Sequence, residues 1–83
     1  MSEFWNRCLE ELRQRYAQEV FKNWFADLQA DETGLESGSL TLIADSGAKA
    51  RTLQTSYGAK IQTVINQTAG REIDITWEVS ESE

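Results

Sequence analysis

Residues 3–28, EFWNRCLEELRQRYAQEVFKNWFADL, decide the fold because they carry two apolar stripes. The first stripe consists of Phe4, Trp5, Cys8, Leu9, Leu12 and Tyr16, and the second of Phe21, Trp24, Phe25 and Leu28. Spacings of three and four place side chains on one face of a helix, and such a face must be buried. The polar run 17–19 separates the stripes. We therefore expect two helices, about 3–15 and 18–28, meeting at a corner, with Ser2 as the N-cap of the first.

In the remaining sequence, the spacing of apolar residues changes three times. Turn residues at 33–34 and 36–39 predict a hairpin that joins strands at about 29–32 and 39–44. A stripe of period 3.6 predicts a third helix, capped by Asp45 or Ser46, with Gly70 as its stop and Gly58 inside it at a point of close packing. The last strand has alternating apolar residues, namely Ile73, Ile75, Trp77 and Val79, which predict one buried face.

The order helix-helix-strand-strand-helix-strand predicts an α+β domain. The simplest arrangement that buries the apolar faces of these elements is a small three-stranded sheet with helices on one face. A chain of 83 residues allows one small domain, which we expect to span 1–79, with 80–83 as a polar tail or the start of a linker.

Composition restricts the classes of function. The chain has a net charge of −6, no histidine and a single cysteine. Without histidine, the Ser-His and Cys-His nucleophile pairs and the commonest metal ligand are absent. The sequence therefore predicts no enzyme, no metal site and no cofactor. The lone Cys8 is expected to be a buried apolar residue in a reducing cytoplasm, because it cannot form an internal disulfide.

The predicted helix 3–15 has more apolar residues than one buried face can hold. The excess indicates a surface that contacts another molecule. Phe4 and Trp5 are adjacent, so both can hardly face the same core. We expect a partly exposed Trp5, with Leu9 and Tyr16 nearby, to form a weak homodimer. Trp24 and Trp77 lie centrally in their stripes and are expected in the core.

Three basic residues around the third helix, Lys49, Arg51 and Lys60, are candidates for weak nucleic-acid contact. The acidic balance of the chain opposes a strong grip on phosphates. Scattered solvated cations are the competing interpretation.

The aromatic pattern as a whole resembles the N-terminal domain of the bacterial replication initiator DnaA. The resemblance is carried by Phe4-Trp5-x-x-Cys8-Leu9-x-x-Leu12, by Phe21-x-x-Trp24-Phe25-x-x-Leu28-Gln29-Ala30, by Leu40-Thr41-Leu42-x-Ala44, by Tyr57-x-x-x-Ile61 and by the last strand. It spans Phe4 to Val79 and implies a fold related to the K-homology arrangement.

The resemblance also implies functions for named positions. Family members self-associate through a tryptophan of helix one, which matches Trp5. They help to load the replicative helicase and dock regulatory proteins through the starts of helices two and three, which here are Glu19, Val20 and Ala48. Weak binding of single-stranded DNA is ascribed to the family. Here Ala48 stands where the family has an exposed phenylalanine, and Val20 stands where it has an acid.

The sequence therefore predicts a self-association and docking module of a replication initiator in the cytoplasm. Two alternatives remain. A K-homology-type nucleic-acid module needs two glycines in its clamping loop, whereas Ser46-Gly47-Ala48-Lys49 supplies one. A stand-alone mimic that occupies the partners of an initiator is also compatible with this sequence.

Overall fold

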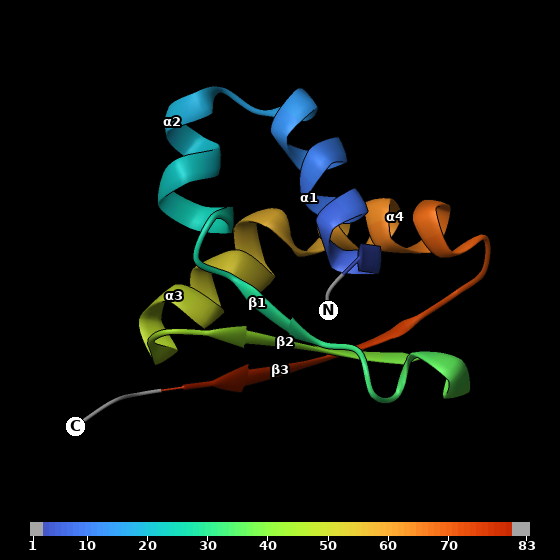
Figure 1. Cartoon of the computed structure of the whole chain (residues 1–83). Helices are drawn as coiled ribbons and strands as arrows, with labels where there is room; N and C mark the ends of the chain where they lie inside the picture. The colour runs from blue at the N-terminus through green and yellow to red at the C-terminus, as the bar shows by residue number, and fades with distance from the viewer. Residues whose placement is uncertain (1–2, 81–83) are drawn as a thin grey trace.

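Three strands form a sheet that is covered on one face by helices in the computed structural model, which describes residues 3–80 (Figure 1). The elements in chain order are α1 (Glu3–Arg15), α2 (Gln18–Val20), η1 (Phe21–Phe25), β1 (Gln29–Asp31), η2 (Leu35–Ser37), β2 (Ser39–Ala44), α3 (Gly47–Thr52), η3 (Leu53–Tyr57), α4 (Gly58–Ala69) and β3 (Asp74–Val79). The predicted α+β class and the order of elements are confirmed. Residues 81–83 of the expected tail lie outside the described part.

Helix α1 buries one narrow stripe, made by Trp5, Cys8 and Leu12, and packs against α4. Its first turn has a tertiary partner, because the Trp5 backbone N–H donates to Glu32 Oε2 at 3.0 Å. A carboxylate at this end satisfies a free amide and matches the helix dipole. Ser2, the expected cap, lies outside the described residues.

The sheet has the order β1-β2-β3, with β1 antiparallel and β3 parallel to the central β2. Leu40, Leu42 and Ala44 of β2 are buried under the helices and alternate with half-buried residues. The predicted hairpin is confirmed. Its connection closes through η2 and Gly38, whose φ of 89° is a left-handed conformation that glycine adopts without strain.

The expected third helix is bent into two pieces. Ser46 caps α3 by accepting from Lys49 N at 3.2 Å, and Gly70 ends α4 with a φ of 76°, as predicted. Between them η3 is a π-helical turn, and Tyr57 leaves helical geometry at φ −123°, ψ −3°. The sequence predicted the third helix but not this bend within it. The two halves of its apolar stripe face different elements, because α3 packs on β2 and β3 whereas α4 packs on α1.

Two further expectations about packing are wrong. A Cβ at Gly58 would lie 3.7 Å from Leu53 O, an ordinary contact, so close packing does not require this glycine. The inward face of β3 is only partly covered, because β3 is an edge strand. Ile75 and Trp77 are half-buried and Val79 is 42 % exposed.

Candidate partner-docking groove

The helical segment after the first corner combines a short α-helix with a π-helical turn. Helix α2 begins after Ala17, which supplies no side-chain cap, and η1 continues it without a break. The wider turn is closed by Ala26 N, which donates to Phe21 O at 3.0 Å. Such π-helical turns often occur at functional sites because they displace side chains from the regular helical register.

An open groove of about 460 Å³ runs between η1 and α3. Its wall on the η1 side is formed by Asn23 and Trp24, and its wall on the α3 side by Ser46, Ala48, Lys49 and Thr52. Lys49 makes an ion pair of 3.8 Å with Asp45, so a cation and an anion lie at one edge. The groove combines an aromatic ring, small side chains and a few polar groups, a composition typical of a contact surface for a protein side chain.

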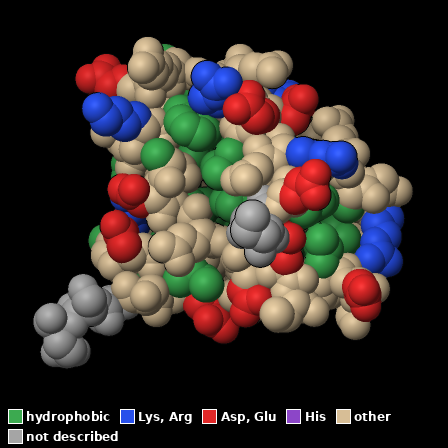
Figure 2. Space-filling model, viewed as in Figure 1, with side chains coloured by type: hydrophobic (Ala, Val, Ile, Leu, Met, Phe, Trp, Pro, Cys, Tyr) green, Lys and Arg blue, Asp and Glu red, His purple; other side chains and the backbone are tan. Residues whose placement is uncertain are grey.

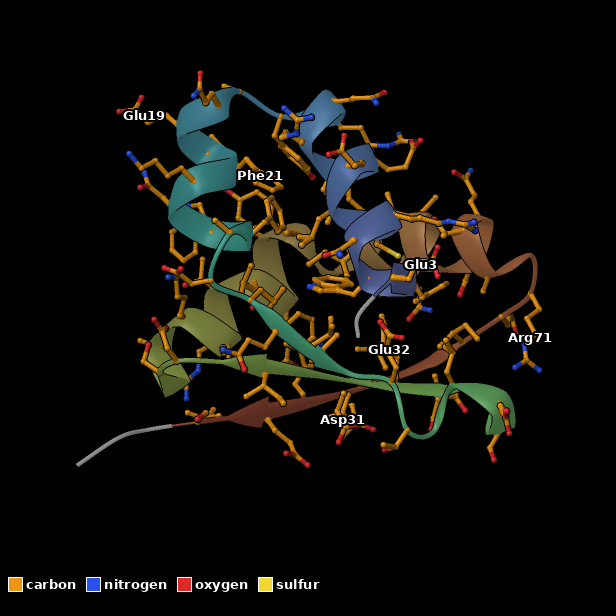
Figure 3. All side chains as sticks on the ribbon, viewed as in Figure 1. Glu3, Glu19, Phe21, Asp31, Glu32 and Arg71 are labelled. Carbon is orange, nitrogen blue, oxygen red and sulfur yellow. The ribbon has the colours of Figure 1, made fainter. Side chains whose placement is uncertain are left out.

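The docking residues expected from the resemblance do not all lie in this groove. Ala48 lines it and is exposed. Val20 is half-buried and packs against the core one turn before Trp24. Glu19 is exposed, and Figure 3 shows its side chain at the outer end of α2, directed away from the fold.

Four lining residues were missed by the sequence analysis as members of a docking site, namely Asn23, Ser46, Lys49 and Thr52. The sequence contained a signal for one of these four residues. Thr52 lies four residues after Ala48, so both share a helix face. The other three could not be identified, because their contribution depends on how η1 and α3 meet in space.

Trp24 was expected in the core, and this prediction is wrong. Its side chain is half-buried and lines the groove, whereas the adjacent Phe25 is fully buried. The Trp24 ring lies 6.0 Å from that of Tyr57, and Phe25 lies 5.3 Å from the same ring. Tyr57 therefore holds the aromatic cluster together at the bend of the third helix, with Trp24 at its outer edge.

The expected exposure of Trp5 is also wrong. Its side chain is 3 % exposed, and its indole Nε1 donates to Leu28 O at 3.0 Å. The physical reason is the hydrogen bond: the loop after η1 presents a carbonyl that satisfies the indole inside the core. Leu9 and Tyr16 remain half-buried, and the Tyr16 ring packs 5.2 Å from Phe25 and 5.5 Å from Tyr57. The three expected self-association residues therefore do not form one exposed surface.

The three candidate nucleic-acid residues are not gathered into a patch. Lys49 lines the groove beside Trp24, whereas Arg51 lines a different hollow that includes Val79. Lys60 follows the bend, on the exposed side of α4. Dispersed cations on an acidic chain form no continuous track for a phosphate backbone.

The titratable groups with displaced pKa values belong to the scaffold. Burial raises the pKa of the Cys8 thiol to about 11, against a partial opposing effect of the Thr68 hydroxyl. Burial also raises the pKa of Tyr16, with a contribution from Tyr57. Hydrogen bonds from the Thr33 backbone and side chain lower the pKa of Asp31. These shifts follow from packing and turn formation, and none of them lies in the groove.

Within residues 3–80, no three histidine, cysteine or acidic side chains approach closely enough to hold a metal ion. No helix in the same part of the chain is long and apolar enough to cross a membrane. The described residues thus form a small α+β domain with an open groove between η1 and α3.

Comparison with known proteins identifies the family. The model of the DnaA N-terminal domain matches residues 2–67, and the chain belongs to this family. Among solved structures, the fold is similar to a chain in the crystal structure of a HobA–DnaA (domain I–II) complex from Helicobacter pylori. That match has a TM-score of 0.77 at 18 % identity and covers 90 % of this chain and 95 % of the other. A search of curated proteins returns no match.

Proposed function

We propose that this domain is a protein-interaction module of a replication initiator and docks the replicative helicase or initiator-regulating proteins through the groove between η1 and α3. The observation that carries the proposal is the half-buried Trp24, which lies in an open groove together with Ala48. Ala48 is the position at which the family resemblance implies docking. The related H. pylori structure contains DnaA with HobA, so a domain of this fold occurs in a complex with another protein.

The groove sets requirements for its partner. Interface energy concentrates on bulky aromatic anchors in desolvated pockets. Trp24 supplies the aromatic surface, and Ala48 is small where the family has an exposed phenylalanine. The partner must therefore contribute the bulky apolar side chain, which would lie on Trp24 and against Ala48. Lys49 and Asp45 at the edge favour polar contacts at the rim of the interface.

A matched pair of variants tests this surface. Ala48 and Ala59 are both exposed alanines at the second position of a helix, α3 and α4 respectively. Ala48→Glu should weaken binding of the cognate helicase by at least about tenfold, which corresponds to about 1.4 kcal/mol. Ala59→Glu should leave the affinity within about twofold of wild type. Binding would be measured by biolayer interferometry with the immobilised domain, and equal losses in both variants would refute the groove.

We also propose that the domain self-associates weakly through α1. Leu9 supports this, because it is a half-buried apolar residue of α1 that is not part of the fully buried stripe. Tyr16 follows the end of α1 and packs on Phe25 and Tyr57, so it adjoins this surface only at its edge. Trp5 contributes only by shaping α1, since its side chain is inside the core. Many copies gathered on DNA would supply avidity without tight pairing.

Sedimentation equilibrium over a wide concentration range tests self-association. Wild type should show a monomer–dimer equilibrium that Leu9→Glu abolishes. Ala17→Glu, at an exposed site beyond α1, is the control for added charge and should dimerise normally. A wild-type chain that stays monomeric at the highest concentration would exclude this part of the proposal and leave the docking groove untouched.

A further inference from the structure

A second groove lies between α1 and the α2–η1 segment, on the opposite side of η1 from the docking residues. Its volume is about 460 Å³, and it is lined by Arg13 of α1 and by Gln18, Phe21, Lys22 and Ala26. It shares no lining residue with the η1–α3 groove. In Figure 2, hydrophobic atoms are exposed between these two helices, with basic side chains on both sides of them.

The floor of this groove is apolar. Phe21 is half-buried, its ring lies 6.1 Å from that of the buried Phe25, and the residue lines the groove, so part of its side chain packs on the core while part remains accessible. Figure 3 shows Phe21 directed from η1 toward α1. Ala26 adds a small exposed side chain beside it. An accessible aromatic face with a small neighbour accommodates one bulky apolar side chain.

The walls of the groove are basic, although the protein carries a net charge of −6. Arg13 Nη2 lies 2.8 Å from Glu10 Oε1, but these side chains are 59 % and 60 % exposed. Such an exposed pair is worth little and exchanges readily for another carboxylate. Lys22 is exposed and has no carboxylate within 4.0 Å among residues 3–80. Two cations on facing elements are therefore available to a ligand.

We propose that this groove binds an acidic peptide segment that carries one aromatic side chain. The aromatic ring lies on Phe21 beside Ala26, and flanking carboxylates pair with Lys22 and Arg13. The charge pattern favours a peptide over a nucleic acid, because a polyanion gains affinity only by neutralising several phosphates. An extended phosphate chain carries a charge at every residue and would place several of them near Glu10, Glu11 and Glu19 on the same two helices. A short peptide with two carboxylates can place both of them at Arg13 and Lys22.

The experiment is a titration of the isotope-labelled domain followed by amide NMR. The probe is a ten-residue peptide, blocked at both ends, with one aspartate on each side of a central phenylalanine and glycine elsewhere. The comparison peptide has lysine in place of aspartate. We expect the aspartate peptide to shift the amide signals of Phe21, Lys22 and Ala26, and the lysine peptide to shift none of them.

Two charge-reversal variants separate the groove from general electrostatics. Lys22→Glu should weaken peptide binding by at least about tenfold, because it removes one wall cation and adds a repulsive charge. Lys60→Glu makes the same change of net charge at an exposed position on α4 and should alter the affinity less than about twofold. Both sites are exposed, so both variants are expected to keep the fold, which amide spectra would verify.

Four results would overturn the proposal. They are absence of shifts at millimolar peptide, equal weakening by both variants, shifts confined to Trp24 and Ala48, and tighter binding of a ten-nucleotide oligothymidylate to the Phe21 region than of the peptide. The third result would assign the peptide to the η1–α3 groove. Failure of helicase docking at that groove has no bearing on this test, because the two grooves have different residues.

Discussion

Trp5 and Trp24 occupy similar positions in their helical stripes but have opposite environments. Trp5 is buried between α1 and the loop that follows η1, and the one polar atom of its side chain, Nε1, donates to Leu28 O at 3.0 Å. Trp24 is half-buried and lines a groove between η1 and α3. Each stripe therefore contains one tryptophan. Trp5 of the first stripe supports the scaffold, whereas Trp24 of the second is available for contact.

The difference shows that burial of an aromatic residue depends on what faces it. Opposite Trp5 lies a backbone carbonyl that accepts the indole hydrogen, which removes the cost of burying the N–H group. Opposite Trp24 lie the first turns of α3, whose small residues Ser46 and Ala48 do not cover the ring. Variants of the two tryptophans test this contrast directly, and variants at Cys8, Glu32 and Gly58 test the scaffold on which it depends.

Substitution of Trp5 should have the largest effect. Trp5→Ala leaves a large cavity and an unpaired Leu28 carbonyl, so the free energy of unfolding should fall by about 3–5 kcal/mol. A domain of this size has little stability to spare, and the variant is expected to be largely unfolded. Trp24→Ala should cost less, about 1–2 kcal/mol, because the ring is already partly in water. Urea unfolding followed by circular dichroism would measure both, and equal losses would contradict the contrast.

The second effect is an alkaline loss of stability due to Cys8. The folded thiol has a pKa raised to about 11 from an ordinary value of 9.0, so above pH 9 the unfolded chain releases a proton that the folded chain retains. Unfolding therefore becomes easier as pH rises from 9 to 11, by about 2 kcal/mol over this range. Tyr16 contributes in the same direction.

The Cys8→Ala variant isolates the contribution of the thiol. Its unfolding free energy should fall less steeply between pH 9 and 11 than that of the wild type, although it starts lower because of the lost side-chain volume. Identical slopes in the two proteins would mean that Cys8 does not retain its proton in the folded state. Chemical denaturation at a series of pH values would provide both slopes.

A smaller effect is expected at the start of α1. Glu32→Ala removes the acceptor for Trp5 N and should lower the free energy of unfolding by about 1 kcal/mol, as for the loss of an N-cap. Glu36→Ala, at an exposed site in η2 with the same loss of charge, should change stability by less than about 0.5 kcal/mol. If both variants lose the same amount, the effect is one of net charge.

The smallest effect should be a gain in stability. Gly58 has helical dihedrals of φ −56° and ψ −42°, and a Cβ there would make only an ordinary contact of 3.7 Å. Gly58→Ala should therefore raise the free energy of unfolding by about 0.5–1 kcal/mol, chiefly by restricting the unfolded chain. A thermal melt would detect this, and a loss of stability would show that the bend at Tyr57 requires glycine after it.

Much of the fold could be predicted because its signals are local. The spacing in α1, the turn residues before β2 and the alternation in β3 each depend on residues within one element. The bend at Tyr57 was missed because the apolar stripe continues at the same period through both halves of the third helix. Only the different partners of the two halves, the sheet for α3 and α1 for α4, require the chain to change direction.

The candidate site was predicted less well. Ala48 was identified through the family resemblance and does line the groove, whereas Glu19 and Val20 lie a turn away from it. The facing wall on η1 comes from a segment more than twenty residues earlier, and no spacing rule connects the two. Hydrophobic content likewise could not decide which tryptophan is exposed, since both have the same apolar surface.

The sequence by itself determined the order of elements, the buried stripes, the absence of histidine chemistry and membership of the DnaA N-terminal family. The first three follow from periodicity and composition, which act within a few residues of the chain, whereas family membership rests on the match of residues 2–67 to the family model. Only the tertiary structure decided that Trp5 is inside and Trp24 at the surface, that Glu32 caps α1, and that two separate grooves border η1. Each of these depends on a contact between distant segments, such as the 3.0 Å hydrogen bond from Trp5 to Leu28 O.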